Sequence, residues 1–142
     1  MKIETILEAK GSTVYSVHAN DSIADAIKLL NQHNIGVVVV VDDKGAIAGI
    51  LSERDVVRNM ADDGGAVMQA RVSKCMTANP VTCTPDSTVD ELMQLMTRRR
   101  IRHVPVIDHG RIAGLISIGD VVKRKIEEAE GEAAAMRDYI AS

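Results

Sequence analysis

The chain has 142 residues, of which 46% are hydrophobic and 26% are charged, and its formal net charge is −3. These values are typical of one globular domain and exclude a collagen, a disordered segment and a membrane-spanning protein, because the longest strongly apolar run, 36–41, is far shorter than the roughly 18 residues of a span. The N-terminus also lacks the apolar core of a signal peptide, so we expect a cytoplasmic protein.

The first group of predicted elements occupies residues 14–58. A short strand over 14–17 is followed by Ser22 and Asp25, which have the spacing of a side chain that caps a helix and a carboxylate that supports it. The buried face of that helix follows the i, i+3, i+4, i+7 pattern and consists of Ile23, Ala26, Ile27 and Leu30. The runs 37–41 and 47–51 predict two strands joined by a turn, and a second helix is expected to begin at Ser52.

The same order of elements recurs over residues 80–123. A short strand over 81–83 precedes Thr88 and Glu91, which repeat the capping pattern. The next helix has its apolar face at Val89, Leu92, Met93 and Met96. Strands are expected over 104–107 and 112–116, and a second helix at Ser117.

An internal repeat explains this recurrence. Residues 14–58 align with 80–123 with one gap near Lys44; thirteen aligned positions are identical, and eight of them fall between Gly45 and Val57. A β-α-β-β-α unit cannot cover both faces of its small sheet, so we expect an α/β (α+β) fold in which two pseudo-symmetric repeats pack through their sheets. The predicted boundaries are 1–60 for repeat 1, 61–76 for a connector, 77–126 for repeat 2 and 127–142 for an acidic helical tail.

The most specific local pattern is Gly-h-h-Ser-x-x-Asp, where h is apolar, at 49–55 and again at 114–120. Its serine and aspartate can form a capping box, which stabilises a helix start by about 0.5 to 2 kcal/mol without any ligand. The same arrangement offers free N–H groups and the positive end of the helix dipole to an anion, and a carboxylate to the hydroxyls of a ribose. Both interpretations are open from the residues alone.

The repeat and its doubled motif resemble a tandem pair of cystathionine β-synthase (CBS) domains, the Bateman module. Lys10-Gly11, the segment 72–77 and the segment 102–108 also match, so that the resemblance covers residues 1 to about 126. It implies a regulatory module without catalysis that binds AMP, ADP, ATP, NAD(H) or S-adenosylmethionine in clefts between the repeats. It also implies a flat homodimer that signals to an effector protein, which the sequence does not name.

The resemblance implies that each cleft is built from both repeats. In one cleft, which we call the Asp55 cleft, Asp55 would bind ribose, with Ser52 and Arg54 near a phosphate. The facing wall would consist of Asn79, Pro80, Val81, Ile101, Arg102, His103 and Pro105. Arg102 and His103 match positions where related modules have basic phosphate ligands. The adjacent residues 98–100 either add to that charge or form a solvated helix end.

The second cleft, which we call the Asp120 cleft, would combine Ser117 and Asp120 with Gly36 and Val37. No basic residue matches the phosphate-binding positions there. We therefore expect unequal sites, with the better phosphate site in the Asp55 cleft and a more apolar Asp120 cleft that is empty or takes a base and ribose. An arginine-rich wall favours a phosphate-bearing ligand, but the residues do not choose among AMP, ATP, NAD(H) and S-adenosylmethionine.

Other functional classes have weaker support. The histidines are dispersed, Cys75 and Cys83 have no C-x-x-C spacing, and the motifs of common hydrolases and nucleotide triphosphatases are missing, so we expect neither an enzyme nor a metal site. A nucleic-acid interface over 98–102 and 123–125 is disfavoured by the net negative charge and the two lone aromatic residues. A dimerisation module that binds no ligand is the remaining alternative.

The tail carries a pattern of its own. Its apolar residues follow a 4-3-4-3-4 spacing typical of a heptad seam and are Val122, Ile126, Ala129, Ala133, Met136 and Ile140. This pattern predicts a helix that packs against a partner subunit, lies over its own domain or frays.

Overall fold

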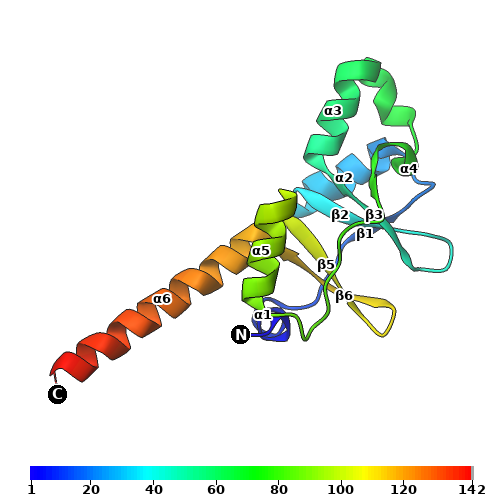
Figure 1. Cartoon of the computed structure of the whole chain (residues 1–142). Coiled ribbons are helices and arrows are strands. Elements are labelled where there is room, and N and C mark those ends of the chain that lie inside the picture. Colours follow the sequence, from blue (N-terminus) through cyan, green and yellow to red (C-terminus); the bar gives the residue numbers. More distant parts are fainter. Residues whose placement is uncertain (142) are drawn as a thin grey trace.

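The computed structural model describes residues 1–141 and contains two α/β units and a long projecting helix (Figure 1). The first unit consists of β1 (Ser16–His18), α2 (Ile23–His33), β2 (Val37–Val41), β3 (Ile47–Ser52) and α3 (Glu53–Asp63). The second consists of α5 (Val89–Arg99), β5 (His103–Asp108), β6 (Arg111–Ser117) and α6 (Ile118–Ala141). The remaining elements are α1 (Ile3–Lys10), the 3₁₀ helix η1 (Gly64–Gln69), α4 (Val72–Cys75) and β4 (Thr77–Ala78). The predicted α/β fold with two repeats is confirmed.

The two sheets differ in size. In the first, β1 is parallel to β2, and β2, β3 and β4 follow as antiparallel neighbours. In the second, β5 and β6 form an antiparallel pair, and the strand predicted over 81–83 is reduced to one parallel bridge between Cys83 and Val106. Pro80 and Pro85 flank this segment and have no N–H to donate, which limits the ladder on both sides.

The helix starts follow the predicted capping pattern. At the start of α3, the Ser52 hydroxyl accepts the Asp55 N–H at 3.2 Å, and the Asp55 carboxylate accepts the Ser52 N–H at 3.0 Å. At the start of α6, Ser117 and Asp120 make the same two bonds at 3.2 and 2.9 Å. Ser22 caps α2, and Thr88 forms a capping box with Glu91 at α5. The doubled motif therefore stabilises two equivalent helix starts, each at the end of a strand.

Each unit is completed by a helix that precedes the other unit in the chain. Ile3 and Ile6 of α1 lie in the hydrophobic core of the second repeat, and the Ile3 N–H donates to the Ser87 carbonyl at 2.8 Å. Val72 of α4 lies in the core of the first repeat, and its N–H donates to the Asp21 carbonyl at 2.8 Å. The repeats are thus interlocked. A cut after residue 60 or after residue 76 would separate α1 from the core of the second repeat, to which it belongs.

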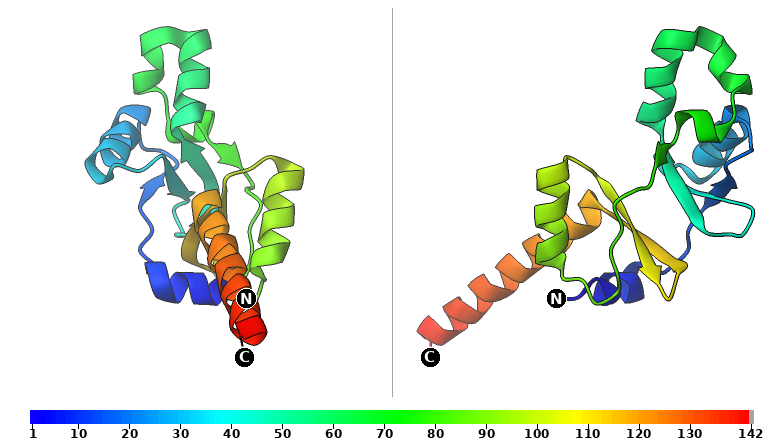
Figure 2. Two further views of the ribbon diagram at one scale, coloured as in Figure 1. Left: turned by 90° about the vertical axis from the view of Figure 1, so that its left-hand side faces the viewer. Right: turned by 45° about the vertical axis from the view of Figure 1, so that its right-hand side comes forward.

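Helix α6 leaves the body after its first turns and projects away from it, as the two views in Figure 2 show. Val121 is its one residue in the buried core of the second repeat. The predicted tail runs along this helix, with residue 142 outside the described residues. No helix within residues 1–141 is long and apolar enough to cross a membrane.

Candidate functional site

A cavity of about 310 Å³ opens between the two repeats. This volume is at the lower end of the range of small-molecule sites, about 300 to 1,000 Å³. Its wall combines the end of α1 and the following loop, the start of β2, and the adjacent strands β5 and β6. The lining residues are Lys10, Thr13, Val14, Tyr15, Ile35, Gly36, Val37, His103, Leu115 and Ser117. Gly36, Val37 and Ser117, which were predicted for the Asp120 cleft, are therefore brought together. Asp120 itself does not line the cavity and is connected to its wall through hydrogen bonds with Lys10 and Ser117.

A cation that sequence reasoning did not assign to a site lies beside this cavity. The Lys10 ammonium donates to Asp120 Oδ2 at 2.8 Å and to the Leu115 carbonyl at 2.9 Å. The Ser117 N–H also donates to Asp120 Oδ2, at 2.9 Å. Burial opposes ionisation of Asp120, but the bonds from Lys10 and Ser117 outweigh it and lower the pKa of this carboxyl. Asp120 is therefore a carboxylate near neutral pH, and both bonds leave its Oδ1 available to a further donor.

His103 lies on the wall of the same cavity, opposite Ser117 in the register of β5 and β6. Burial and the positive charge of Lys10 lower the pKa of His103, and the Asp120 carboxylate opposes this shift only in part. The imidazole is therefore neutral at neutral pH and can both donate and accept a hydrogen bond. The family resemblance assigns His103 to the Asp55 cleft, whereas the cavity that it lines belongs to the Asp120 cleft.

An aromatic surface forms another part of the wall. Tyr15 stacks on His33 with ring centroids 3.7 Å apart and planes inclined by 18°. This pair joins the segment before β1 to the end of α2. The sequence does not predict this contact, because no local motif links Tyr15, which precedes β1, with His33 at the end of α2.

The repeat alignment relates this cavity to the Asp55 cleft. It maps 13–15 onto 79–81, 35–37 onto 101–103 and Ser117 onto Ser52. The residues expected in the Asp55 cleft are therefore the repeat equivalents of residues that line the cavity. The main difference is that Gly36, which has no side chain, corresponds to Arg102, which is exposed and cationic. The residues expected in the two clefts thus occupy equivalent positions of the repeat and differ in charge.

Two other residues expected at the Asp55 cleft have distinctive surroundings or backbone geometry. Asp55 is only 8% exposed, and its Oδ1 is 4.0 Å from the Arg58 guanidinium. Asn79 is exposed with a positive φ of 49°.

The rest of that expected set ranges from exposed to buried. Arg54 is exposed in the first turn of α3, Pro80, Val81 and Ile101 are half-buried, and Pro105 is buried in β5. Residues 98–100 form the exposed end of α5, where the Arg100 N–H donates to the Met96 carbonyl.

The possible metal-ligating and thiol side chains of residues 1–141 are dispersed. This part of the chain has no cluster of three or more histidine, cysteine, aspartate or glutamate side chains with a geometry for a metal ion. Cys75 and Cys83 are separate, reduced and buried. Burial raises the pKa of the Cys83 thiol to about 11, so it is protonated and unreactive at neutral pH.

The fold is a tandem repeat of two α/β units, and similarity to known proteins identifies its family. The family model described as "CBS domain" matches residues 11–62 and again residues 72–127. The chain therefore belongs to the CBS domain family and carries a tandem pair of these domains.

Related proteins match most of the chain. The mitochondrial CBS domain-containing protein CBSX3 of Arabidopsis thaliana is 39% identical over 136 residues, which are 93% of this chain and 66% of that protein. The CBS domain-containing protein YhcV of Bacillus subtilis is 30% identical over 133 residues, which are 92% of this chain and 93% of that protein.

Solved structures show the same fold. The CBS-domain containing protein ATU1752 from Agrobacterium tumefaciens is 48% identical, with a TM-score of 0.84 over 87% of this chain and 92% of that chain. The CBS domain pair of protein MJ0100, solved in complex with 5′-methylthioadenosine and S-adenosylmethionine, is 28% identical, with a TM-score of 0.76 over 87% of this chain and 98% of that chain. A CBS pair of this fold thus binds adenosyl ligands in MJ0100.

Proposed function

We propose that this CBS pair is a regulatory module that binds an adenine nucleotide such as AMP, ADP, ATP or NAD(H), or a related adenosyl ligand, between its repeats and catalyses no reaction. The observation that carries the proposal is the cavity between the repeats, which is lined by a stacked tyrosine and by Lys10 and Ser117, the two residues that hydrogen-bond the ionised Asp120 carboxylate. The adenosyl ligands of the related MJ0100 pair support the ligand class.

Each group at the Asp120 cleft has a chemical counterpart in an adenosyl ligand. Asp120 Oδ1 can accept a bond from a ribose hydroxyl, as acidic residues do in dinucleotide-binding folds. The exposed face of Tyr15 can stack on a purine. Lys10 can turn its ammonium from Asp120 toward a phosphate or another anionic group, because its side chain is long and 39% exposed.

The Asp55 cleft is proposed as the second and more strongly phosphate-binding site. Arg102 provides a planar donor where the Asp120 cleft has Gly36, and a guanidinium binds phosphate in a bidentate manner. The Asp55 carboxylate is held by the Ser52 N–H through Oδ2, and its Oδ1, which lies 4.0 Å from the Arg58 guanidinium, is the oxygen that would accept a ribose hydroxyl. The two sites are therefore unequal, and the Asp55 cleft selects for ligands that carry phosphate.

Binding in these clefts changes the energy of the arrangement of the repeats. The cavity wall comes from both units, so a ligand stabilises the arrangement in which both walls contact it, by its differential affinity for that arrangement. We propose that this change is transmitted to an effector protein by a homodimer of the chain.

Calorimetric titration with AMP, ATP, NADH and S-adenosylmethionine, at one salt concentration, tests the proposal. The matched variants are Asp55→Asn and Asp120→Asn, because asparagine keeps an oxygen that can accept the capping N–H and removes only the charge. We expect micromolar binding to the wild type, loss of the tighter phosphate-bearing site in Asp55→Asn, and loss of the second site in Asp120→Asn.

Two other results would replace the proposed function. A wild type that binds none of the four compounds would be a dimerisation module without a ligand. Binding to nucleic acid that falls steeply with salt would instead indicate an electrostatic polyanion interface.

A further inference from the structure

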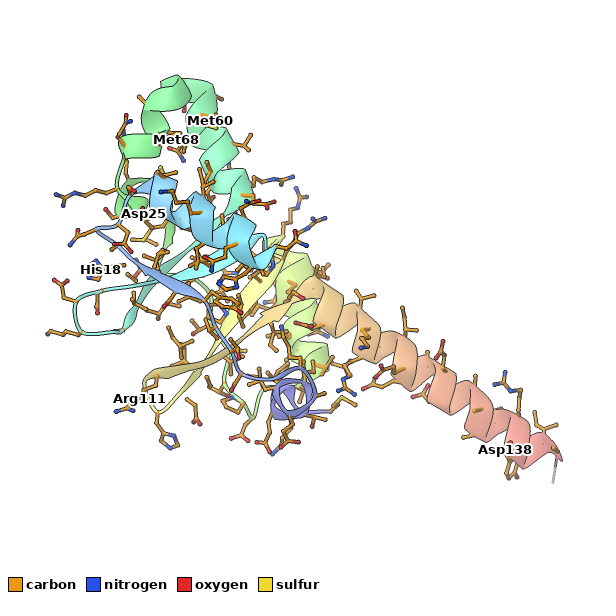
Figure 3. The ribbon with its side chains drawn as sticks, turned by 180° about the vertical axis from the view of Figure 1, so that it is seen from behind. His18, Asp25, Met60, Met68, Arg111 and Asp138 are labelled. Atoms are coloured by element: carbon orange, nitrogen blue, oxygen red, sulfur yellow. The ribbon has the colours of Figure 1, made fainter. Side chains whose placement is uncertain are left out.

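The apolar seam on α6 is uncovered. Val122 is 43% exposed, Ile126 53%, Met136 60% and Ile140 75%, and the two alanines between them, Ala129 and Ala133, are exposed as well. Beyond its first turns the helix extends away from the body, and Asp138 near its end lies far from both units (Figure 3). An isolated helix without a packed face is only marginally stable in water, so this seam requires a partner.

We propose that the partner is a second copy of this chain and that the two α6 helices form a parallel, in-register coiled coil. In heptad notation Ile126, Ala133 and Ile140 are at position a, and Val122, Ala129 and Met136 are at position d. A parallel pairing therefore covers all six seam residues. This inference does not depend on ligand binding in the clefts.

The charges beside the seam match the parallel orientation. Lys125 and Glu132 occupy position g, and Glu130 and Arg137 occupy position e. In a parallel pair each g residue faces the next e residue of the partner. Glu132 thus faces Arg137 of the partner subunit, and Lys125 faces Glu130 of the partner subunit. Every such pair is of opposite charge and occurs twice by symmetry.

Lys125 already has partners on its own chain. Its ammonium donates to Asp90 at 2.8 Å and to Glu128 at 3.1 Å, which fixes the base of α6 on α5. The pair formed by Glu132 and Arg137, on the projecting part of α6, is therefore the one that selects the orientation.

An antiparallel pairing conflicts with the same charges. The register that covers all six seam residues brings Glu130 and Glu132 each opposite its own copy, and Lys123 opposite Arg137 of the partner subunit. A slip by one heptad removes these contacts but leaves two seam residues without a partner, either Met136 and Ile140 or Val122 and Ile126, depending on its direction. Only the parallel, in-register pair covers the whole seam and also matches its charges.

A charge swap in the full-length chain tests the pairing, with the dimer dissociation constant measured by analytical ultracentrifugation. We expect Glu132→Lys and Arg137→Glu each to raise that constant at least tenfold, and the double variant to restore it, because the swap recreates the opposite-charge pair. Both residues lie on the exposed tail, so the body of each variant folds normally, which circular dichroism verifies. A monomeric wild type at tens of micromolar, unchanged single variants, or a double variant that does not recover would overturn the proposal.

Cysteine cross-linking tests the register independently. In the parallel pair Ala133 faces its own copy, so Ala133→Cys is expected to form a disulfide-linked dimer under mild oxidation. The matched control is Ala135→Cys, on the outer face two residues further along, which is expected to stay unlinked. Equal cross-linking of the two variants, or linkage only when Ala129→Cys and Ala133→Cys chains are mixed, would overturn the parallel arrangement.

Discussion

Strand β4 lies very close to Gly49, the first residue of the Gly-h-h-Ser-x-x-Asp motif in the first repeat. A substitution at Gly49 therefore tests whether this motif needs a glycine where β4 packs against β3. A Cβ atom at position 49 would lie 2.5 Å from the Thr77 carbonyl oxygen and 2.9 Å from Met76 Sδ. The Thr77 oxygen belongs to the backbone of β4, which pairs with β3 at this point and leads directly to Asn79. Gly49→Ala must therefore push β4 away from β3 and displace the wall of the Asp55 cleft.

The expected cost follows from this overpacking. An extra methyl group forced against the backbone destabilises a protein by about 1 to 3 kcal/mol. For a domain of about 150 residues this corresponds to a fall in Tm of roughly 2 to 12 °C. Thermal unfolding followed by circular dichroism at one fixed protein concentration measures the change, and titration with AMP measures the effect on the cleft.

The repeat provides a matched control at the equivalent glycine. A Cβ atom at Gly114 would contact the end of the Leu7 side chain, which can change its rotamer, whereas the backbone of β4 cannot move so easily. Gly114→Ala is therefore expected to lower Tm by less than Gly49→Ala. If Gly49→Ala unfolds at the wild-type temperature, or if Gly114→Ala is the less stable of the two, the assignment of Gly49 to a close backbone approach is wrong.

Three further predictions concern the charges and caps of the clefts. Lys10→Met removes the cation beside Asp120. Because this ion pair is partly exposed, the variant is expected to lower the free energy of unfolding by up to about 1 kcal/mol. It is also expected to raise the pKa of Asp120, which NMR titration would detect. Folding lowers the pKa of His103, so as the pH falls the unfolded chain binds a proton before the folded chain does, and the free energy of unfolding is expected to decrease below about pH 6.5. In urea unfolding, the free energy of His103→Gln should depend less on pH in this window. A pH dependence identical to that of the wild type would contradict the argument that burial lowers the pKa. Ser52→Ala removes the cap of α3 and is expected to cost about 1 kcal/mol in urea unfolding, and no change would mean that the Asp55 bonds alone maintain the helix start.

Much of this fold is predictable because its signals are local. The capping pairs Ser52 with Asp55 and Ser117 with Asp120 lie three residues apart, and the strands and helices between them follow from short apolar patterns. The repeat then doubles each signal. The sequence also predicts unequal clefts, because Gly36 and Arg102 occupy equivalent positions of the repeat, and this stays a prediction.

The remaining features depend on contacts that no local pattern encodes. Lys10 reaches Asp120 across 110 positions of sequence, because α1 covers the core of the second repeat and not of the first. Similarly, β4 joins the first sheet through Gly49, although its residues fall within the segment 77–126 that was predicted as the second repeat. The sequence alone predicts that each repeat needs a further element to bury its sheet. Which element packs against which repeat is determined by contacts between residues that are distant in the chain.

A crystal structure of the chain grown with saturating AMP tests the central claim most directly. The account predicts a nucleotide between the two repeats, with its ribose hydroxyls within hydrogen-bond distance of the Asp55 or Asp120 carboxylate and its phosphate nearest Arg102 or Lys10. Clefts without a nucleotide at saturating concentration, or AMP bound only on a surface away from both aspartates, would contradict it.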